Sequence, residues 1–105
     1  MSDKFKLVGH HVVPVEDLFE WARWFETAKC KVAYDTISPG VQVSTVFLGL
    51  DHNFGMAGRP ILFKTVVFGG PLDGEQERYH TWDEAEQGHR AMVERAASAE
   101  PLTSR

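Results

Sequence analysis

The stretch from residue 43 to residue 89 constrains the fold most, because two apolar segments are separated by a polar loop and followed by a capped amphipathic segment. Residues 41–50 and 60–69 are rich in β-branched and aromatic residues, which favours strands. Residues 51–59 contain two glycines among polar side chains and predict a loop. Two strands followed by a helix in a short chain indicate a mixed α+β domain.

A helix is predicted from Thr81 to about Ala97. Thr81 and Glu84 have the spacing of a capping box, in which the Thr81 hydroxyl accepts from the Glu84 amide and the Glu84 carboxylate bonds back to the Thr81 amide. The predicted apolar face of this helix consists of Trp82, Ala85, His89, Met92, Val93 and Ala96. Residues 98–105 are predicted to form a frayed tail.

The N-terminal part of the chain predicts one strand and one helix. Residues 5–13 predict a strand that ends at Pro14, because proline cannot donate to a sheet ladder. Residues 15–28 predict a helix with Glu16 and Asp17 in its first turn, where carboxylates interact favourably with the helix dipole.

The predicted helix of residues 15–28 is apolar around an unusually wide arc. Its stripe at helical spacing consists of Val15, Leu18, Phe19, Ala22 and Phe25. Trp21 extends the stripe, and Trp24 lies roughly opposite Val15. Because tryptophan and arginine are over-represented at binding hot spots, Trp21, Arg23 and Trp24 are candidate interface residues. A homodimer or larger assembly that buries Trp24 is predicted, since monomers rarely expose large apolar patches.

Residues 31–37 and 41–50 predict a hairpin, because residues 38–40, Ser-Pro-Gly, have turn chemistry. Residues 70–78 predict a polar loop after the strand at 60–69. The order β-α-β-β-β-α predicts a single α+β domain with an antiparallel meander sheet packed by two helices. The third and fourth strands are predicted to be apolar on both sides.

Composition limits the possible partners. The 105 residues correspond to one domain, residues 1–105, and the net charge of -4 with eleven scattered basic residues argues against nucleic-acid binding. The single cysteine, Cys30, excludes an internal disulfide and fits a reducing cytoplasm. No stretch approaches the apolar length of a membrane span, so no membrane association is expected.

Polar side chains at the end of an apolar strand form a candidate ligand-binding site. A strand can aim such groups while the following loop leaves them accessible. The candidate ligand-binding residues are Asp51, His52, Asn53, Arg59, Trp82 and His89. The alternatives remain open that the Asp51–Asn53 segment bonds its own backbone in a turn, and that His89 is a half-buried histidine of the helix face.

No catalytic, metal or cofactor site is predicted. Asp51, His52, His80 and His89 could supply ligands, but no two of them have tight metal-ligand spacing on one helix. A hydrolase that uses His52 and His89 is the enzymatic alternative, without a substrate to nominate.

Specific blocks run through most of the chain: residues 20–26, residues 43–55, Phe68-Gly69-Gly70, Arg78-Tyr79, Thr81-Trp82, Glu84-Ala85 and Gly88-His89. In these blocks the chain resembles a family of small uncharacterised proteins carried by bacteriophages and prophages. The resemblance implies a phage accessory role in a bacterial cytoplasm and implies no reaction.

Two functional hypotheses follow. The first is a non-enzymatic binding module that engages itself or a host protein, by analogy an inhibitor of host machinery or of a defence system. The second is a small-molecule or nucleotide-binding protein with a pocket near Asp51, His52 and His89.

Overall fold

A computed structural model describes residues 3–53 and 58–99. The elements are β1 (Lys4–Val8), β2 (His11–Val15), α1 (Leu18–Thr27), β3 (Lys31–Ser38), β4 (Val41–Phe47), β5 (Phe63–Phe68), β6 (Gln76–Tyr79) and α2 (Trp82–Ala99). They form a two-stranded sheet, β1-β2, and a four-stranded meander, β3-β4-β5-β6, with every pairing antiparallel. The predicted α+β class, meander and pair of helices are confirmed, and the chain has two more strands than predicted.

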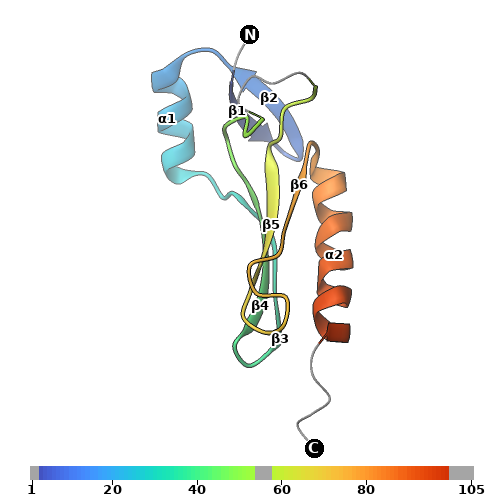
Figure 1. Cartoon of the computed structure of the whole chain (residues 1–105). Helices are drawn as coiled ribbons and strands as arrows, with labels where there is room; N and C mark the ends of the chain where they lie inside the picture. Colours follow the sequence, from blue (N-terminus) through green and yellow to red (C-terminus); the bar gives the residue numbers. More distant parts are fainter. Residues whose placement is uncertain (1–2, 54–57, 100–105) are drawn as a thin grey trace, which may run out of the picture.

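The molecule is elongated, with the β1-β2 hairpin and α1 at one end and the β3-β4 turn at the other (Figure 1). α2 runs along one face of the four-stranded sheet and contacts all of its strands. α1 packs on β1 and β2, and its Trp24 reaches Phe47 at the end of β4. The amide of Phe5 donates to the carbonyl of Gly49 at 2.8 Å and joins the hairpin to the chain beyond β4.

The predicted strand at residues 5–13 is a hairpin. Gly9 adopts a φ of 63° and turns the chain between β1 and β2. Pro14 lies inside β2, opposite Phe5, rather than ending a strand. Proline is tolerated there because β2 is an edge strand and its missing amide costs no ladder bond.

α1 begins three residues later than predicted. Asp17 caps it by accepting from the amides of Phe19 at 2.8 Å and Glu20 at 3.1 Å. Val15 belongs to β2 and is buried there. Val15 therefore does not mark the inward face of α1.

β6 occupies part of the segment that was predicted to be a polar loop. Its four residues, Gln76–Tyr79, pair only with β5 and form an edge of the sheet. Edge strands commonly carry charged side chains that discourage pairing with other chains, and such residues hide the strand pattern. β5 begins at Phe63 rather than at residue 60, while the turn between β3 and β4 is confirmed, with Gly40 at a φ of 82°.

The four-stranded sheet buries only the face that α2 covers. Inward residues alternate with half-exposed ones along β4 and β5; the buried set is Val41, Val43, Thr45, Phe47, Phe63, Thr65 and Val67. The opposite side of β4 carries Gln42, Ser44 and Val46, so the prediction that this strand is apolar on both sides is wrong. One face of the sheet is thus open within a single chain.

α2 confirms its predicted face, with Ala85, His89, Met92 and Ala96 buried. The Thr81 hydroxyl accepts from the Glu84 amide at 3.1 Å, as the capping box predicts. The Glu84 carboxylate accepts from the amide of His80 at 2.9 Å, and the Thr81 amide makes a weaker contact with the same carboxylate.

Gly88 is required by close packing between α2 and β6. A Cβ at this position would lie 2.2 Å from atoms of the Tyr79 ring. The helix therefore accepts the conformational cost of glycine because an aromatic ring lies directly on its backbone. The predicted tail at residues 98–105 is helical at 98 and 99, and its remainder lies outside the described residues.

Candidate functional site

His89 is the centre of a buried polar chain. Its Nε2 lies 2.7 Å from the Asp35 carboxylate, and its Nδ1 lies 2.7 Å from the Thr45 hydroxyl. The Thr45 hydroxyl lies 2.5 Å from the hydroxyl of Thr65 on the neighbouring strand. His89 is only 3% exposed, while the Asp35 side chain on edge strand β3 reaches solvent.

This buried polar chain contains a carboxylate, an imidazole and hydroxyl groups, the residue types of a catalytic triad. Their arrangement, however, fits a structural role. A carboxylate only accepts hydrogen bonds, so Nε2 of His89 donates to Asp35. The hydroxyls of Thr45 and Thr65 are enclosed between the sheet and α2, and both residues have no exposed surface. A nucleophile must reach its substrate, so this arrangement anchors α2 to the sheet and does not favour a hydrolase.

Sequence reasoning missed Asp35, Thr45 and Thr65. Thr45 is separated from His89 by 44 positions, and Asp35 by 54. The available signal was a pair of threonines at inward positions of two apolar strands, where an isolated hydroxyl requires a partner.

The Asp51–Asn53 segment bonds its own backbone. The Asp51 carboxylate accepts from the amides of Asn53 at 2.7 Å and Ile61 at 3.0 Å. The His52 amide donates to the carbonyl of Ile61 at 2.9 Å and continues the β4-β5 pairing beyond the strands. Asp51 therefore holds the two ends of the loop together, which is the alternative left open by the sequence.

Arg59 and Asn53 are also engaged near this loop. The Asn53 side-chain amide donates to the Arg59 carbonyl at 3.2 Å. The Arg59 guanidinium lies 3.7 Å from the Glu84 carboxylate at the start of α2, and both side chains are largely exposed. The bond from the His80 amide is the main reason that the pKa of Glu84 lies below its ordinary value, with a smaller contribution from Arg59.

Trp82 lines a shallow hollow between the β1-β2 turn and the start of α2. The hollow has a volume of about 280 Å³ and is lined by His10, His11, Val12, Thr81, Trp82 and Asp83. The His10 ring stacks on Trp82 with centroids 3.8 Å apart and planes at 9°. The His10 ring therefore prevents a ligand ring from stacking on that face of Trp82. The Trp82 ring also meets the Phe63 ring edge-on, with centroids 6.3 Å apart.

The six predicted ligand-binding residues thus divide into separate groups. The loop groups Asp51, His52, Asn53 and Arg59, whereas Trp82 lies against His10, and His89 directs both ring nitrogens to Asp35 and Thr45. The structure therefore does not bring these six side chains together in one pocket.

The predicted interface tryptophans pack inward. Nε1 of Trp21 donates to the carbonyls of Phe5 at 3.0 Å and Gly49 at 3.2 Å. Trp24 meets Phe47 of the core edge-on, with ring centroids 6.0 Å apart. Arg23 is exposed on the helix surface. The reason for expecting assembly through Trp24 is therefore removed, and assembly itself stays a prediction.

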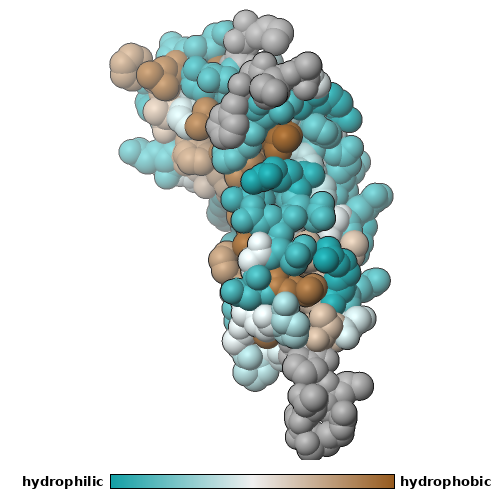
Figure 2. All heavy atoms as spheres, in the orientation of Figure 1, coloured by the Kyte–Doolittle hydropathy of each residue, from teal (hydrophilic) through white to brown (hydrophobic). Residues whose placement is uncertain are grey.

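Instead, α1 directs other apolar side chains to solvent. Leu18 is 56% exposed, Phe19 73% and Phe25 37%, and no residue of α1 is fully buried. With exposed Ala22 they form the α1 stripe: Leu18, Phe19, Ala22 and Phe25. Figure 2 shows hydrophobic atoms gathered over α1 at the upper left of the molecule. Such a concentration on one short helix is unusual for a surface without a partner.

Cys30 is half-buried beside the core, and burial raises the pKa of its thiol. Such a thiol is protonated near neutrality and is a poor nucleophile. This position fits a small apolar side chain better than a reactive one.

The described side chains and the comparisons with known proteins place few limits on function. The part of the chain that the structure describes contains no group of three or more His, Cys, Asp or Glu residues that could hold a metal ion. Neither described helix is long and apolar enough to cross a membrane. No family model, curated protein or solved structure matches this chain.

Proposed function

We propose that this protein is a non-enzymatic accessory binding module, of the phage type that the sequence resembles, which engages a second protein through the α1 stripe. The observation that carries the proposal is the exposure of Leu18 and Phe19 on one helix, with part of the Phe25 ring exposed beside them. An amphipathic helix that lays its apolar face into a groove of another protein is a recurrent mode of recognition.

The core under α1 is complete without Leu18 and Phe19, whereas Phe25 stacks on Trp21 with ring centroids 5.0 Å apart. Trp21 and Trp24 already hold the helix against β1 and the end of β4. The exposed Leu18 and Phe19 therefore contribute little to folding, and their exposure costs solubility unless a partner covers them. That imbalance supports a binding role for the stripe.

Charge around the stripe favours a different protein over a second copy. Glu16 and Glu26 are exposed near its two ends. Glu20 lies 3.3 Å from Lys6, and Asp17 caps its own helix. Exposed Arg23 is outnumbered by these carboxylates, so packing α1 against α1 would bring more like charges together than opposite ones, whereas a groove with a basic rim would complement them.

The alternative of a small-molecule or nucleotide pocket has less support. Asp51 is engaged by backbone amides, His89 by Asp35 and Thr45, and one face of Trp82 by His10. No single cluster offers these groups to one ligand.

Affinity capture from a bacterial lysate tests the proposal. Wild-type protein is compared with Phe19→Ser and with the control Thr27→Ser, which alters an exposed residue near the end of the same helix. A discrete partner that is retained by wild type and the control and lost from Phe19→Ser supports the proposal. Equal capture by all three proteins, or none above a bare matrix, overturns it; return of the protein itself in a larger assembly makes the partner a second copy.

A further inference from the structure

The open face of the four-stranded sheet carries an ordered set of side chains. Residues paired between antiparallel strands lie side by side on the same face, so the strand register defines rows across the sheet. The first row is Lys31, Val46, Lys64 and Arg78. The second is Tyr34, Ser44, Val66 and Gln76, and the third is Thr36, Gln42 and Phe68.

These rows contain three cations and no carboxylate, although the whole chain has a net charge of -4. Among the described residues, Lys31, Lys64 and Arg78 form no ion pair. The nearest hydrogen bond of Arg78 is a long one of 3.5 Å to the Gln76 side chain. The cationic row crosses three strand spacings, about 14 Å.

The carboxylates of the same strands lie on the other face. Asp35 is paired with inward-facing Val43, and Glu77 with inward-facing Thr65. α2, which covers that face, adds four carboxylates against two cations, Arg90 and Arg95; the carboxylates are Asp83, Glu84, Glu86 and Glu94. The sheet therefore separates the charges, and the net negative charge of the chain does not describe the open face.

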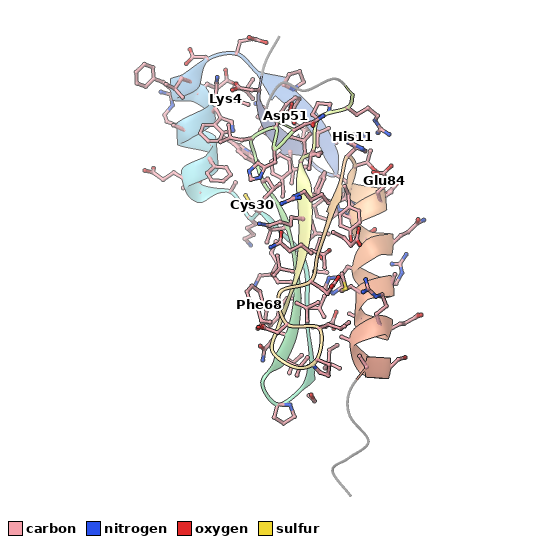
Figure 3. All side chains as sticks on the ribbon, in the orientation of Figure 1. Lys4, His11, Cys30, Asp51, Phe68 and Glu84 are labelled. Atoms are coloured by element: carbon pink, nitrogen blue, oxygen red, sulfur yellow. The ribbon has the colours of Figure 1, made fainter. Side chains whose placement is uncertain are left out.

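Two aromatic rings are presented on the same face. Tyr34 and Phe68 are each 50% exposed. Phe68, labelled in Figure 3, lies on the side of the sheet away from α2. Lys31 Nζ lies 4.9 Å from the centroid of the Tyr34 ring, which places the lysine on the open face with it.

We infer that the open face binds single-stranded nucleic acid, with Lys31, Lys64 and Arg78 contacting phosphates and Tyr34 and Phe68 stacking on bases. Uncompensated cations beside exposed aromatic planes are the combination that sequence-tolerant single-strand binders use. An acidic polypeptide would use the cations but not the rings, and duplex DNA requires a helix or ribbon that enters a groove. The surface is separate from the α1 stripe and does not depend on a protein partner there.

This inference departs from the expectation drawn from composition. Lys31, Lys64 and Arg78 are far apart in the sequence and are scattered among acidic residues. Only the antiparallel register brings them into one row. Local charge at a surface, rather than net charge, decides whether a polyanion is attracted at short range.

Fluorescence anisotropy of the whole protein with a labelled oligothymidylate of about 12 nucleotides tests the inference. Three phosphate contacts predict a slope of about −2 for log affinity against log salt, and Lys64→Gln should reduce its magnitude by about 0.7. Tyr34→Ala should weaken binding about 5-fold or more, as expected for loss of one stacked base. The charge-matched control Arg90→Gln, on exposed α2 surface, should leave the affinity unchanged.

Three results would overturn the inference: no saturable binding at low salt, equal weakening by Arg90→Gln and Lys64→Gln, or tighter binding of duplex than of single strand. Equal competition by polyglutamate, with no effect of Tyr34→Ala, would assign the face to an acidic polypeptide instead. The three substituted residues are at least partly exposed, so each variant should keep the fold, and circular dichroism checks that it does.

Discussion

Thr45→Val tests the polar chain that anchors α2 to the sheet. Valine has nearly the shape of threonine, so the substitution removes one hydroxyl without leaving a cavity. The His89 Nδ1 and the Thr65 hydroxyl then lose their partner at 2.7 Å and 2.5 Å, respectively, and both residues are buried. An orphaned buried polar group costs about 1–3 kcal/mol, and one added buried methyl returns a little under 1 kcal/mol.

The free energy of unfolding should therefore fall by about 2–4 kcal/mol, a large part of the stability of a small domain. Urea denaturation at neutral pH, followed by circular dichroism, should show a midpoint lower by about 1–2 M, given the usual slope for small proteins. Thr36→Val makes the same chemical change at an exposed position of the open face and should change the stability by less than about 0.5 kcal/mol.

A triple variant separates loss of partners from loss of packing. Thr45→Val, Thr65→Val and His89→Leu together remove every member of the buried chain, and Asp35 can then be hydrated because its side chain is 56% exposed. The triple variant should be more stable than Thr45→Val alone, because it leaves no buried member of the polar chain without its partner. A Thr45→Val protein within about 0.5 kcal/mol of wild type, or a triple variant less stable than the single one, would refute the reasoning.

Three further predictions follow from local contacts. Gly88→Ala should destabilise the protein by about 1–3 kcal/mol in thermal melts despite the better helix propensity of alanine, because the new Cβ would lie 2.2 Å from the Tyr79 ring. In a Tyr79→Leu background this penalty should largely disappear. A penalty that persists there would contradict the packing explanation. Because the pKa of Glu84 is lowered on folding, the Glu84 carboxylate stabilises the fold above its ordinary pKa of 4.5, and this stabilisation is lost as the pH falls through the lowered pKa. Glu84→Gln should therefore reduce the fall in the free energy of unfolding below about pH 5. An unchanged pH dependence in this range would exclude the contribution. Because burial raises the pKa of Cys30, iodoacetamide should modify the native protein at mildly alkaline pH more slowly than it modifies glutathione or the urea-unfolded chain, and equal rates would place the thiol in solvent.

Sequence periodicity predicted the elements that have one clearly apolar face. The helical spacing of Ala85, His89, Met92 and Ala96 follows from periodicity and matches the buried positions of α2, whereas the alternation along β4 was missed because its outward positions include Val46. The element boundaries at Pro14 and β6 were missed, because a proline at an edge strand and a polar edge strand both resemble loops. Assigning Val15 to the helix also placed the inward face on the side of Leu18, whereas Trp21 and Trp24 make the core contacts of α1.

The candidate surfaces depend on long-range geometry that periodicity does not contain. His89 could be placed on the inner face of α2, but its partners Asp35 and Thr45 follow from how the helix crosses the sheet. Likewise, the row of Lys31, Lys64 and Arg78 exists only through strand register, which a single sequence specifies weakly at polar edges.

Site-specific photo-crosslinking from α1 tests directly whether the α1 stripe contacts another protein. Benzoylphenylalanine at position 19 keeps an aromatic side chain at the most exposed site of the stripe, and the same group at position 27 is a control on the same helix. After irradiation in bacterial lysate, one discrete crosslinked partner is expected from position 19 and none from position 27. No crosslink from position 19, or the same products from both positions, would contradict the proposed contact.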